Sequence, residues 1–239
     1  MSIFFNNEFN EINKEIISSF PMRTFRDAYP KDFLNNQSMW SYIRILHAFP
    51  KNIDVDVYIN QTKVADNLNY ARFTDFFHIT GGIQYTLKIS PKDSTAPIFT
   101  TTLEVDPAQI YTIALVGTKK EDASILLIPE PEFKINPSIS YLRFCNLSPN
   151  SAALDVSLPD KTKLFLDVQY QEYTEYIELY PKKFTFEIKT FASGDDVLYV
   201  PNISLGAGKV YTMYFIGLYQ GNPKEEVLIP LDGNTYIDL

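Results

Sequence analysis

The sequence predicts an all-β chain of two tandem immunoglobulin-like antiparallel β-sandwiches, preceded by a short N-terminal helix and an extended arm. One observation is a repeat: the segment YIRILHAFPKNIDVDVYI, from Tyr42 to Ile59, returns as YLRFCNLSPNSAALDVSL, from Tyr141 to Leu158. The other is the alternation of apolar and polar residues inside each copy, which is typical of strands. Together they predict two β-rich domains of similar fold.

The two copies keep their register over most of their length. Tyr42 and Tyr141 are 99 residues apart, and matching Pro129 with Pro230 gives an offset of 101 at the far end. Solenoid repeats are roughly 20–50 residues long, so a period near 100 indicates complete domains. We call them copy 1 and copy 2.

Each copy reads as a series of short strands. Val55, Val57 and Ile59 alternate with polar or charged residues, and turn formers such as Gly81 and Gly82 separate such runs. This pattern gives about seven short strands per copy without helices between them, as in an immunoglobulin-like sandwich.

Copy 1 also carries a motif of the form Arg-apolar-x-His-x-x-Pro, then apolar-Asp-Val-Tyr, then a late Tyr-Thr strand that ends in glycine. Its residues are Arg44, His47, Pro50, Asp56 to Tyr58, and Tyr111 to Gly117. The pattern resembles the bacterial family catalogued as domain of unknown function 4397. That resemblance implies tandem β-sandwich modules in an extracytoplasmic or surface setting, and it brings no known active site.

The domain boundaries follow from the repeat. We expect an N-terminal arm at residues 1–40, sandwich repeat 1 at 41–130, a proline-rich linker at 131–140, and repeat 2 with a short C-terminal tail at 141–239. A proline-rich linker is semi-rigid, so the two sandwiches should keep a preferred orientation.

The arm has no counterpart in the repeat, yet it is rich in apolar residues. Its first half has helical spacing and predicts one short amphipathic helix that ends at Pro21. Side chains of this kind must be covered either by the chain's own sandwiches or by another copy of the protein. We therefore expect an assembly arm that docks on a neighbouring subunit through Phe9, Ile12, Ile16, Phe20, Phe25, Tyr29, Phe33 and Trp40.

Composition limits the classes of function. The net charge of −8 and the lack of a Lys/Arg cluster argue against a nucleic-acid partner. We expect no membrane insertion, because no run approaches the ~18 apolar residues of a spanning helix, and the N-terminus does not read as a signal peptide. The single cysteine, Cys145, matches Leu46 of copy 1 and should fill the same buried position.

Two recurring charged positions predict structural ion pairs. Arg44 and Asp56 of copy 1 return as Arg143 and Asp155 of copy 2. We predict an Arg–carboxylate pair, Arg44 with Asp56 and Arg143 with Asp155, bidentate and partly shielded from solvent.

Candidate chemistry is sparse. Asp54 and Asp56 share one face of a strand and could bind Ca²⁺, although acidic residues on a solvated face are the commoner explanation. His47 and His78 are too few for a histidine metal site. We expect no enzyme activity, no cofactor and no metal.

A set of aromatic residues recurs in both copies and offers a candidate binding surface. A sugar platform would display such rings to solvent, whereas core packing or interdomain contact explains them equally well. The set is Tyr70, Phe73, Phe76 and Phe77, matched by Tyr170, Tyr173, Tyr176 and Ile177.

The functional expectation is a non-enzymatic structural protein that self-assembles as a homo-oligomer or polymer. Duplicated sandwiches, an unmatched arm and the lack of catalytic motifs favour a surface layer or filament of the spore coat, exosporium or appendage type, located at the spore or cell surface. The alternative is a monomeric extracellular module that binds a glycan or a protein.

Overall fold

The computed structural model describes residues 39–51, 53–94 and 96–239. The predicted N-terminal helix and most of the arm lie outside these residues. Trp40, which the prediction assigned to the arm, begins the first strand and packs edge-on against His78, with ring centroids 4.2 Å apart.

Copy 1 contains eight strands, one more than expected, and one 3-10 turn. They are β1 (Trp40–His47), β2 (Val55–Ile59), β3 (Thr62–Leu68), β4 (Phe77–Thr80), β5 (Gln84–Pro91), β6 (Phe99–Glu104), β7 (Ile110–Val116), η2 (Lys120–Asp122) and β8 (Ser124–Pro129).

Copy 2 repeats the same eight strands. They are β9 (Ser140–Asn146), β10 (Leu154–Ser157), β11 (Lys163–Val168), β12 (Ile177–Leu179), β13 (Lys183–Thr190), β14 (Asp196–Ser204), β15 (Lys209–Ile216) and β16 (Glu226–Leu228), followed by η3 (Gly233–Thr235).

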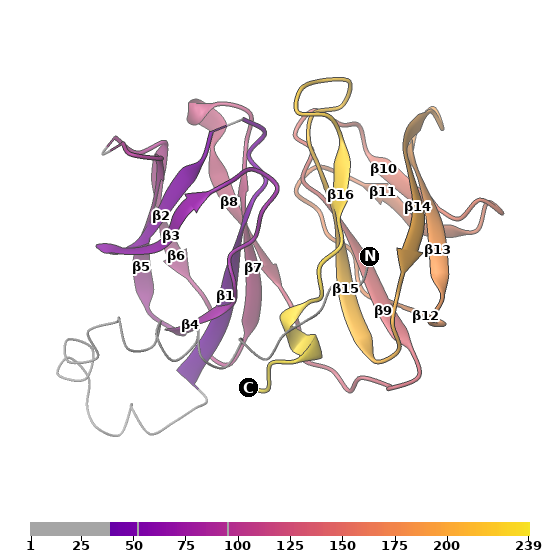
Figure 1. Ribbon diagram of the computed structural model, residues 1–239, viewed down its shortest axis with the longest axis horizontal. Coiled ribbons are helices and arrows are strands. Elements are labelled where there is room, and N and C mark those ends of the chain that lie inside the picture. Colours follow the sequence, from indigo (N-terminus) through magenta and orange to yellow (C-terminus); the bar gives the residue numbers. More distant parts are fainter. Residues whose placement is uncertain (1–38, 52, 95) are drawn as a thin grey trace. The chain divides into compact units, whose positions relative to one another are not determined.

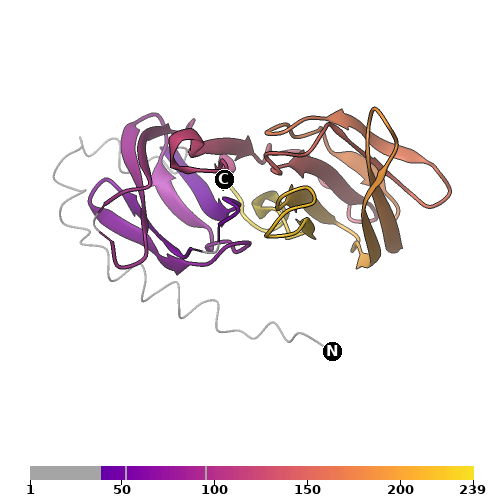
Figure 2. The same ribbon diagram turned by 90° about the horizontal axis from the view of Figure 1, so that it is seen from above.

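Each copy is a sandwich of two four-stranded sheets (Figures 1 and 2). The sheets of order β4-β1-β7-β8 and β12-β9-β15-β16 are called the inner sheets, because they face each other across the apolar cluster described below. Those of order β3-β2-β5-β6 and β11-β10-β13-β14 are called the outer sheets.

The all-β, two-sandwich prediction is confirmed, but the sheets are not wholly antiparallel, and their strand order differs from that of an immunoglobulin domain. An immunoglobulin domain places its first two strands side by side. Here β1 pairs in parallel with β7, and β2 belongs to the other sheet. Period-two patterning shows which residues face a core, but it is the same whichever strand lies alongside.

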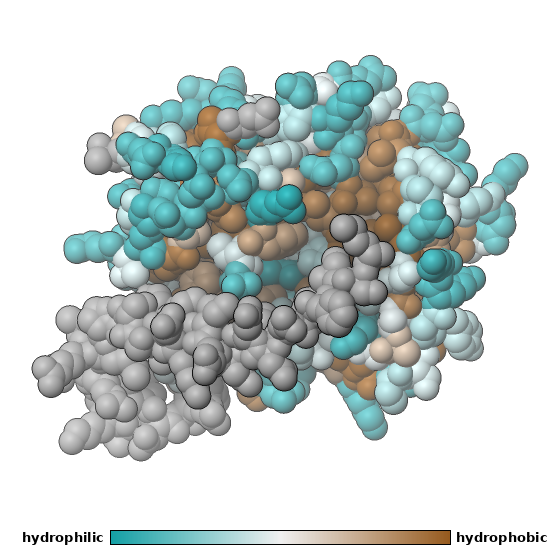
Figure 3. All heavy atoms as spheres, viewed as in Figure 1, coloured by the Kyte–Doolittle hydropathy of each residue, from teal (hydrophilic) through white to brown (hydrophobic). Residues whose placement is uncertain are grey.

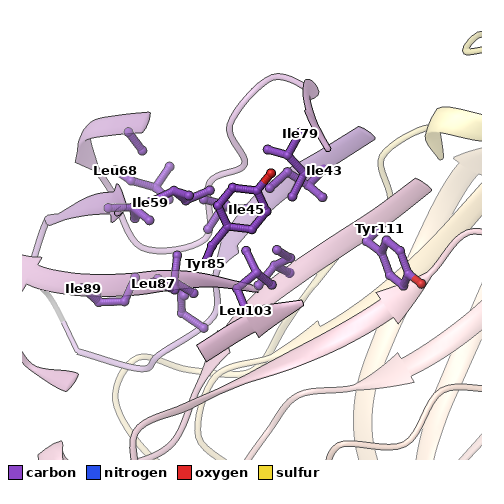
Figure 4. Close-up of a cluster of buried hydrophobic side chains, with 14 of the residues drawn as sticks. Ile43, Ile45, Ile59, Leu68, Ile79, Tyr85, Leu87, Ile89, Leu103 and Tyr111 are labelled. Atoms are coloured by element: carbon purple, nitrogen blue, oxygen red, sulfur yellow. The ribbon is translucent and has the colours of Figure 1, made fainter. Parts of the chain in front are cut away.

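The core of copy 1 has the predicted alternation. Val55, Val57 and Ile59 of β2 and Leu87 and Ile89 of β5 all lie in one buried cluster between the two sheets. Figure 4 shows the ring of Tyr85 among these aliphatic side chains. Copy 2 has a separate core with more aromatic residues, including the stacked rings of Phe184 and Phe186, 5.6 Å apart.

A third apolar cluster joins the two copies. Leu46 on β1 and Ala114 on β7 are fully buried together with Cys145 on β9 and Tyr214 on β15. Because these residues alternate with those of each sandwich core, they lie on the opposite faces of the inner sheets. We call this cluster the inter-copy core. The prediction that Cys145 fills the position of Leu46 is confirmed.

Apolar side chains also reach the surface in places. Figure 3 shows them gathered beside β15 and β16 on the face viewed in Figure 1. Polar side chains therefore do not cover the sandwich of copy 2 completely on this side.

Candidate functional site

The predicted pairs of Arg44 with Asp56 and of Arg143 with Asp155 are wrong. The arginines lie on β1 and β9 of the inner sheets, whereas the aspartates lie on β2 and β10 of the outer sheets. In all four strands the charged residue alternates with core residues, so it points out of the sandwich. Each arginine and its supposed partner therefore lie on opposite outer faces.

The aspartates have local partners instead. Asp56 accepts a hydrogen bond from Lys63 Nζ at 2.8 Å and another from the backbone N–H of Asn67 at 2.9 Å. The bonds from Lys63 and Asn67 lower the pKa of the Asp56 carboxyl. Asp155 makes the equivalent two bonds in copy 2. These carboxylates therefore fix the β2–β3 and β10–β11 hairpins.

Two substitutions separate the contributions at Asp56. Asp56→Ala leaves the Asn67 N–H without its acceptor, and we expect a loss of about 1–3 kcal/mol in the free energy of unfolding. Lys63→Met removes only a partly exposed ion pair, for which we expect about 0–1 kcal/mol. Urea unfolding measures both values. Equal losses would contradict the view that the backbone contact dominates.

Arg44 lies at the centre of a buried polar cluster between the copies. Its Nε donates to Thr112 Oγ1 at 2.7 Å, and its Nη2 donates to Glu130 at 3.0 Å and to Asp232 at 2.9 Å. Its Nη1 donates to the carbonyl oxygen of Leu231 at 2.7 Å. One guanidinium thus bonds to both copies.

Arg143 repeats half of this pattern. Its Nε donates to Thr212 Oγ1 at 2.8 Å, and its Nη1 donates to the carbonyl oxygen of Pro129 at 2.7 Å. Among the described residues its Nη2 has no hydrogen-bond partner, and no carboxylate lies within ion-pair distance. The Tyr176 ring packs on the guanidinium, with its centroid 4.5 Å from Cζ. We call Arg44, Thr112, Glu130, Arg143, Thr212 and Asp232 the arginine cluster.

Sequence reasoning missed both acids of the arginine cluster. Backbone bonds make Glu130 and Asp232 equivalent, because their N–H groups donate to the carbonyls of Ile110 and Val210 at the starts of β7 and β15. The true offset here is therefore 102, not the 101 obtained from the prolines. An alignment with that gap would have placed an acid after the last strand of each copy.

The cluster balances two guanidinium groups against two carboxylates in a buried setting. Burial alone would lower the pKa of Arg44, but Glu130, Tyr214 and Asp232 together raise it by more than burial lowers it. The net pKa is raised, so the guanidinium stays charged. Burial and the neighbouring Asp232 raise the pKa of Glu130 to about 7, against the opposing effect of Arg44. Glu130 is thus the titratable group of the cluster near neutral pH.

The recurring aromatic residues mostly serve the contact between copies. Phe73 and Phe76 pack on the Arg44 guanidinium, with centroids 4.9 Å and 4.7 Å from its Cζ. Phe73 also packs against Tyr214 of copy 2, and Phe76 packs against Tyr236. Interdomain contact, one of the three explanations considered above, therefore accounts for Phe73 and Phe76 in copy 1.

Copy 2 differs at one place. The side chains of Leu166 and Tyr173 are 54% and 40% exposed, and they line an open groove of about 360 Å³ beside β11. Asp167, Gln171 and Glu172 line the same groove. We call it the β11 groove.

The other candidate positions show structural contacts. Asp54 accepts a hydrogen bond from Asn69, and His47 Nε2 lies 3.0 Å from the carbonyl oxygen of Ile53. Within residues 39–51, 53–94 and 96–239, no group of three or more His, Cys, Asp or Glu side chains is arranged to hold a metal ion. The same residues include no helix long and apolar enough to cross a membrane.

The assembly arm lies almost wholly outside the described residues. Apart from Trp40, its predicted contact residues lie outside the described part of the chain. They are Phe9, Ile12, Ile16, Phe20, Phe25, Tyr29 and Phe33.

The chain matches one protein family. The model of the family described as "Domain of unknown function (DUF4397)" matches residues 41–157 and 140–233. These ranges include both copies, so the resemblance noted from the motif is confirmed. No curated protein matches the chain.

Similar solved structures include three bacterial proteins. The chain is 9% identical to CBMbc (family CBM26) from Eubacterium rectale Amy13K in complex with maltoheptaose, over 82% of this chain and 99% of that one, with a TM-score of 0.26. It is 10% identical to the Bacillus anthracis TIE protein. That match covers 79% of this chain and 34% of the other, with a TM-score of 0.24. It is 11% identical to putative polysaccharide binding proteins (DUF1812) from Bacteroides thetaiotaomicron VPI-5482. That match covers 81% of this chain and 96% of the other, with a TM-score of 0.23. At such TM-scores none of the three bears on the fold or the ligand of this chain.

Proposed function

Because the chain belongs to the family described as Domain of unknown function (DUF4397), whose description assigns no activity, we propose from its own surface that it is a non-enzymatic module that binds a neutral glycan in the β11 groove. The observation that carries the proposal is the exposed pair of Leu166 and Tyr173. Copy 1 offers an internal comparison, because it has the same strands without this pair.

Leu166 stands where copy 1 has a charged residue. β3 and β11 are equivalent, since each pairs with the second strand of its copy, and Asp66 is the counterpart of Leu166. Asp66 accepts a hydrogen bond from Lys63 at 2.8 Å. Copy 2 thus exposes an aliphatic side chain where copy 1 carries a solvated ion pair, and apolar groups gathered at a groove favour a contact surface.

Tyr173 differs from its counterpart in a related way. Phe73 packs against Tyr214 of the other copy, with ring centroids 5.6 Å apart. The position equivalent to Tyr214 in copy 1 is Ala114, which offers Tyr173 no ring. One part of the Tyr173 ring therefore stays open to solvent beside Leu166.

The remaining lining residues suit hydroxyl groups. Asp167 and Glu172 provide carboxylate acceptors, and Gln171 provides both an acceptor and donors. A sugar ring can lay its apolar face on Tyr173 while its hydroxyls donate to these groups. Two carboxylates in the groove disfavour an acidic sugar, so a neutral glycan is the better fit.

A substitution that converts copy 2 into copy 1 tests this proposal. Leu166→Asp should weaken binding of neutral oligosaccharides by about tenfold, the effect of losing one buried aliphatic contact. Titration calorimetry with a panel of neutral oligosaccharides measures it. The matched control, Asp66→Leu, gives copy 1 an exposed leucine and should leave binding unchanged. If no neutral glycan of the panel binds the unmodified chain at millimolar concentration, the proposal is wrong.

Assembly through the arm is a separate proposal, supported by the apolar composition of residues 1–40. A surface layer or filament at the spore or cell surface would use the arm as its directional contact. Light scattering and negative-stain microscopy of the full chain and of a chain starting at Ser41 distinguish the cases. Assemblies formed only by the full chain would support it, and monomers from both would exclude it.

A further inference from the structure

We infer that the face between the two copies is a pairing surface that works between molecules, so that copy 1 of one chain accepts copy 2 of a second chain in place of its own. The partner is thus a second copy of this protein. The inference rests on the inter-copy core and the arginine cluster, and it does not depend on glycan binding.

The polar contacts across this face are related by an approximate two-fold symmetry. Arg44 donates from Nη1 to the carbonyl oxygen of Leu231, which precedes Asp232. Arg143 donates from Nη1 to the carbonyl oxygen of Pro129, which precedes Glu130. Each copy therefore gives the other an arginine and receives one at the equivalent carbonyl. Two-fold, self-complementary contacts of this kind are the usual form of interfaces between identical subunits.

The apolar contacts follow the same relation. The fully buried residues Leu46 and Val116 of copy 1 occupy the positions of Cys145 and Ile216 in copy 2. A surface made of equivalent positions on both partners has no feature that requires them to belong to one chain. The covalent linker only raises their effective concentration to the millimolar range.

One position determines which copies can pair. Tyr214 and its counterpart Ala114 are both fully buried in the inter-copy core. The Tyr214 ring packs on Phe73, and its hydroxyl lies 3.4 Å from Arg44 Nη2. Two copy 1 domains would lack this ring and leave a gap, whereas two copy 2 domains would bring a second ring into a filled space. Unlike copies therefore pair in preference to like copies.

The chain connection makes exchange feasible. Residues 130–139 join β8 to β9, and Phe133 packs on Tyr141 with ring centroids 4.9 Å apart. If this linker leaves copy 2, two chains can exchange their second copies and form a closed dimer with two inter-copy faces. The same contacts are then made as in the monomer.

Two full-length variants with complementary defects test the inference. Ala114→Arg blocks the face of copy 1, and Tyr214→Asp blocks the face of copy 2; each core lies on the other side of its inner sheet. Each variant alone should be monomeric, because its one intact face meets only a like copy. An equimolar mixture should form a heterodimer of twice the monomer mass, measured by sedimentation equilibrium. A mixture that stays monomeric, with both variants folded by near-UV circular dichroism, would overturn the inference.

Refolding of the unmodified chain provides a second test if either variant fails to fold. Refolding from urea at about 1 mM protein, comparable to the effective concentration supplied by a short linker, should give a dimer that is nearly absent after refolding at micromolar concentration. Only monomer at both concentrations would contradict exchange. The Leu166→Asp chain should dimerise like the unmodified one, which keeps this result separate from glycan binding.

Discussion

Arg44→Met is expected to lower the free energy of unfolding by about 3–5 kcal/mol, because it leaves two buried carboxylates without their cation. Glu130 and Asp232 both bond to Arg44 Nη2 and are fully buried. Methionine approximates the length of the arginine stem, so the change removes charge and hydrogen bonds more than volume. Urea unfolding at pH 8, above the pKa of Glu130 in the folded chain, measures the loss.

Arg143→Met is the matched control at the equivalent position. Arg143 is also buried and donates to Thr212 and Pro129, but it has no carboxylate partner at ion-pair distance among the described residues. We expect a smaller loss of about 1–3 kcal/mol, the effect of lost hydrogen bonds. Adding Glu130→Gln to Arg44→Met should recover part of the stability, since one unpaired charge is removed. Equal losses at the two arginines would show that the carboxylates of the cluster do not depend on Arg44.

Much of this architecture could be predicted from the sequence. The repeat and its period-two alternation give two β-sandwich domains, and the match of Cys145 with Leu46 gives a buried position in both copies. Such signals are local, because each residue shows by its own polarity whether it faces a core. The strand order is not local, and the parallel pairing of β1 with β7 leaves no trace in the alternation.

The arginine partners show where local signals end. A recurring arginine and a recurring aspartate suggested a pair, yet Arg44 and Asp56 lie on opposite faces of one sandwich, and the partner Asp232 lies in the other copy. Asp232 aligns with Glu130 only if the offset between the copies is one residue larger than the offset between Pro129 and Pro230. The sequence also does not reveal the importance of the difference between Ala114 and Tyr214, because both residue types are acceptable on a buried strand.

The stability of this interface should depend on pH through Glu130. Burial and the neighbouring Asp232 raise the pKa of Glu130 from an ordinary value of 4.5 to about 7. The folded state then binds a proton more tightly than the unfolded state between these two values. Stability is therefore greatest below the ordinary pKa, and it falls as the pH rises toward the folded pKa. A shift of this size corresponds to about 3 kcal/mol across the interval.

Glu130→Gln isolates this contribution. Burial lowers the pKa values of His47 and His78. These two groups therefore act in the opposite sense, because they stabilise the folded state as the pH rises through the ordinary histidine pKa. Both histidines are present in the unmodified chain and in the variant, so their contribution cancels in the difference between the two.

We expect the unmodified chain to lose about 3 kcal/mol more in the free energy of unfolding than Glu130→Gln between pH 5 and pH 8, measured by urea unfolding. Glu132→Gln, an exposed acid in the linker, controls for net charge and should behave like the unmodified chain. Parallel pH profiles for Glu130→Gln and the unmodified chain would mean that Glu130 titrates in its ordinary range, fully compensated by Arg44.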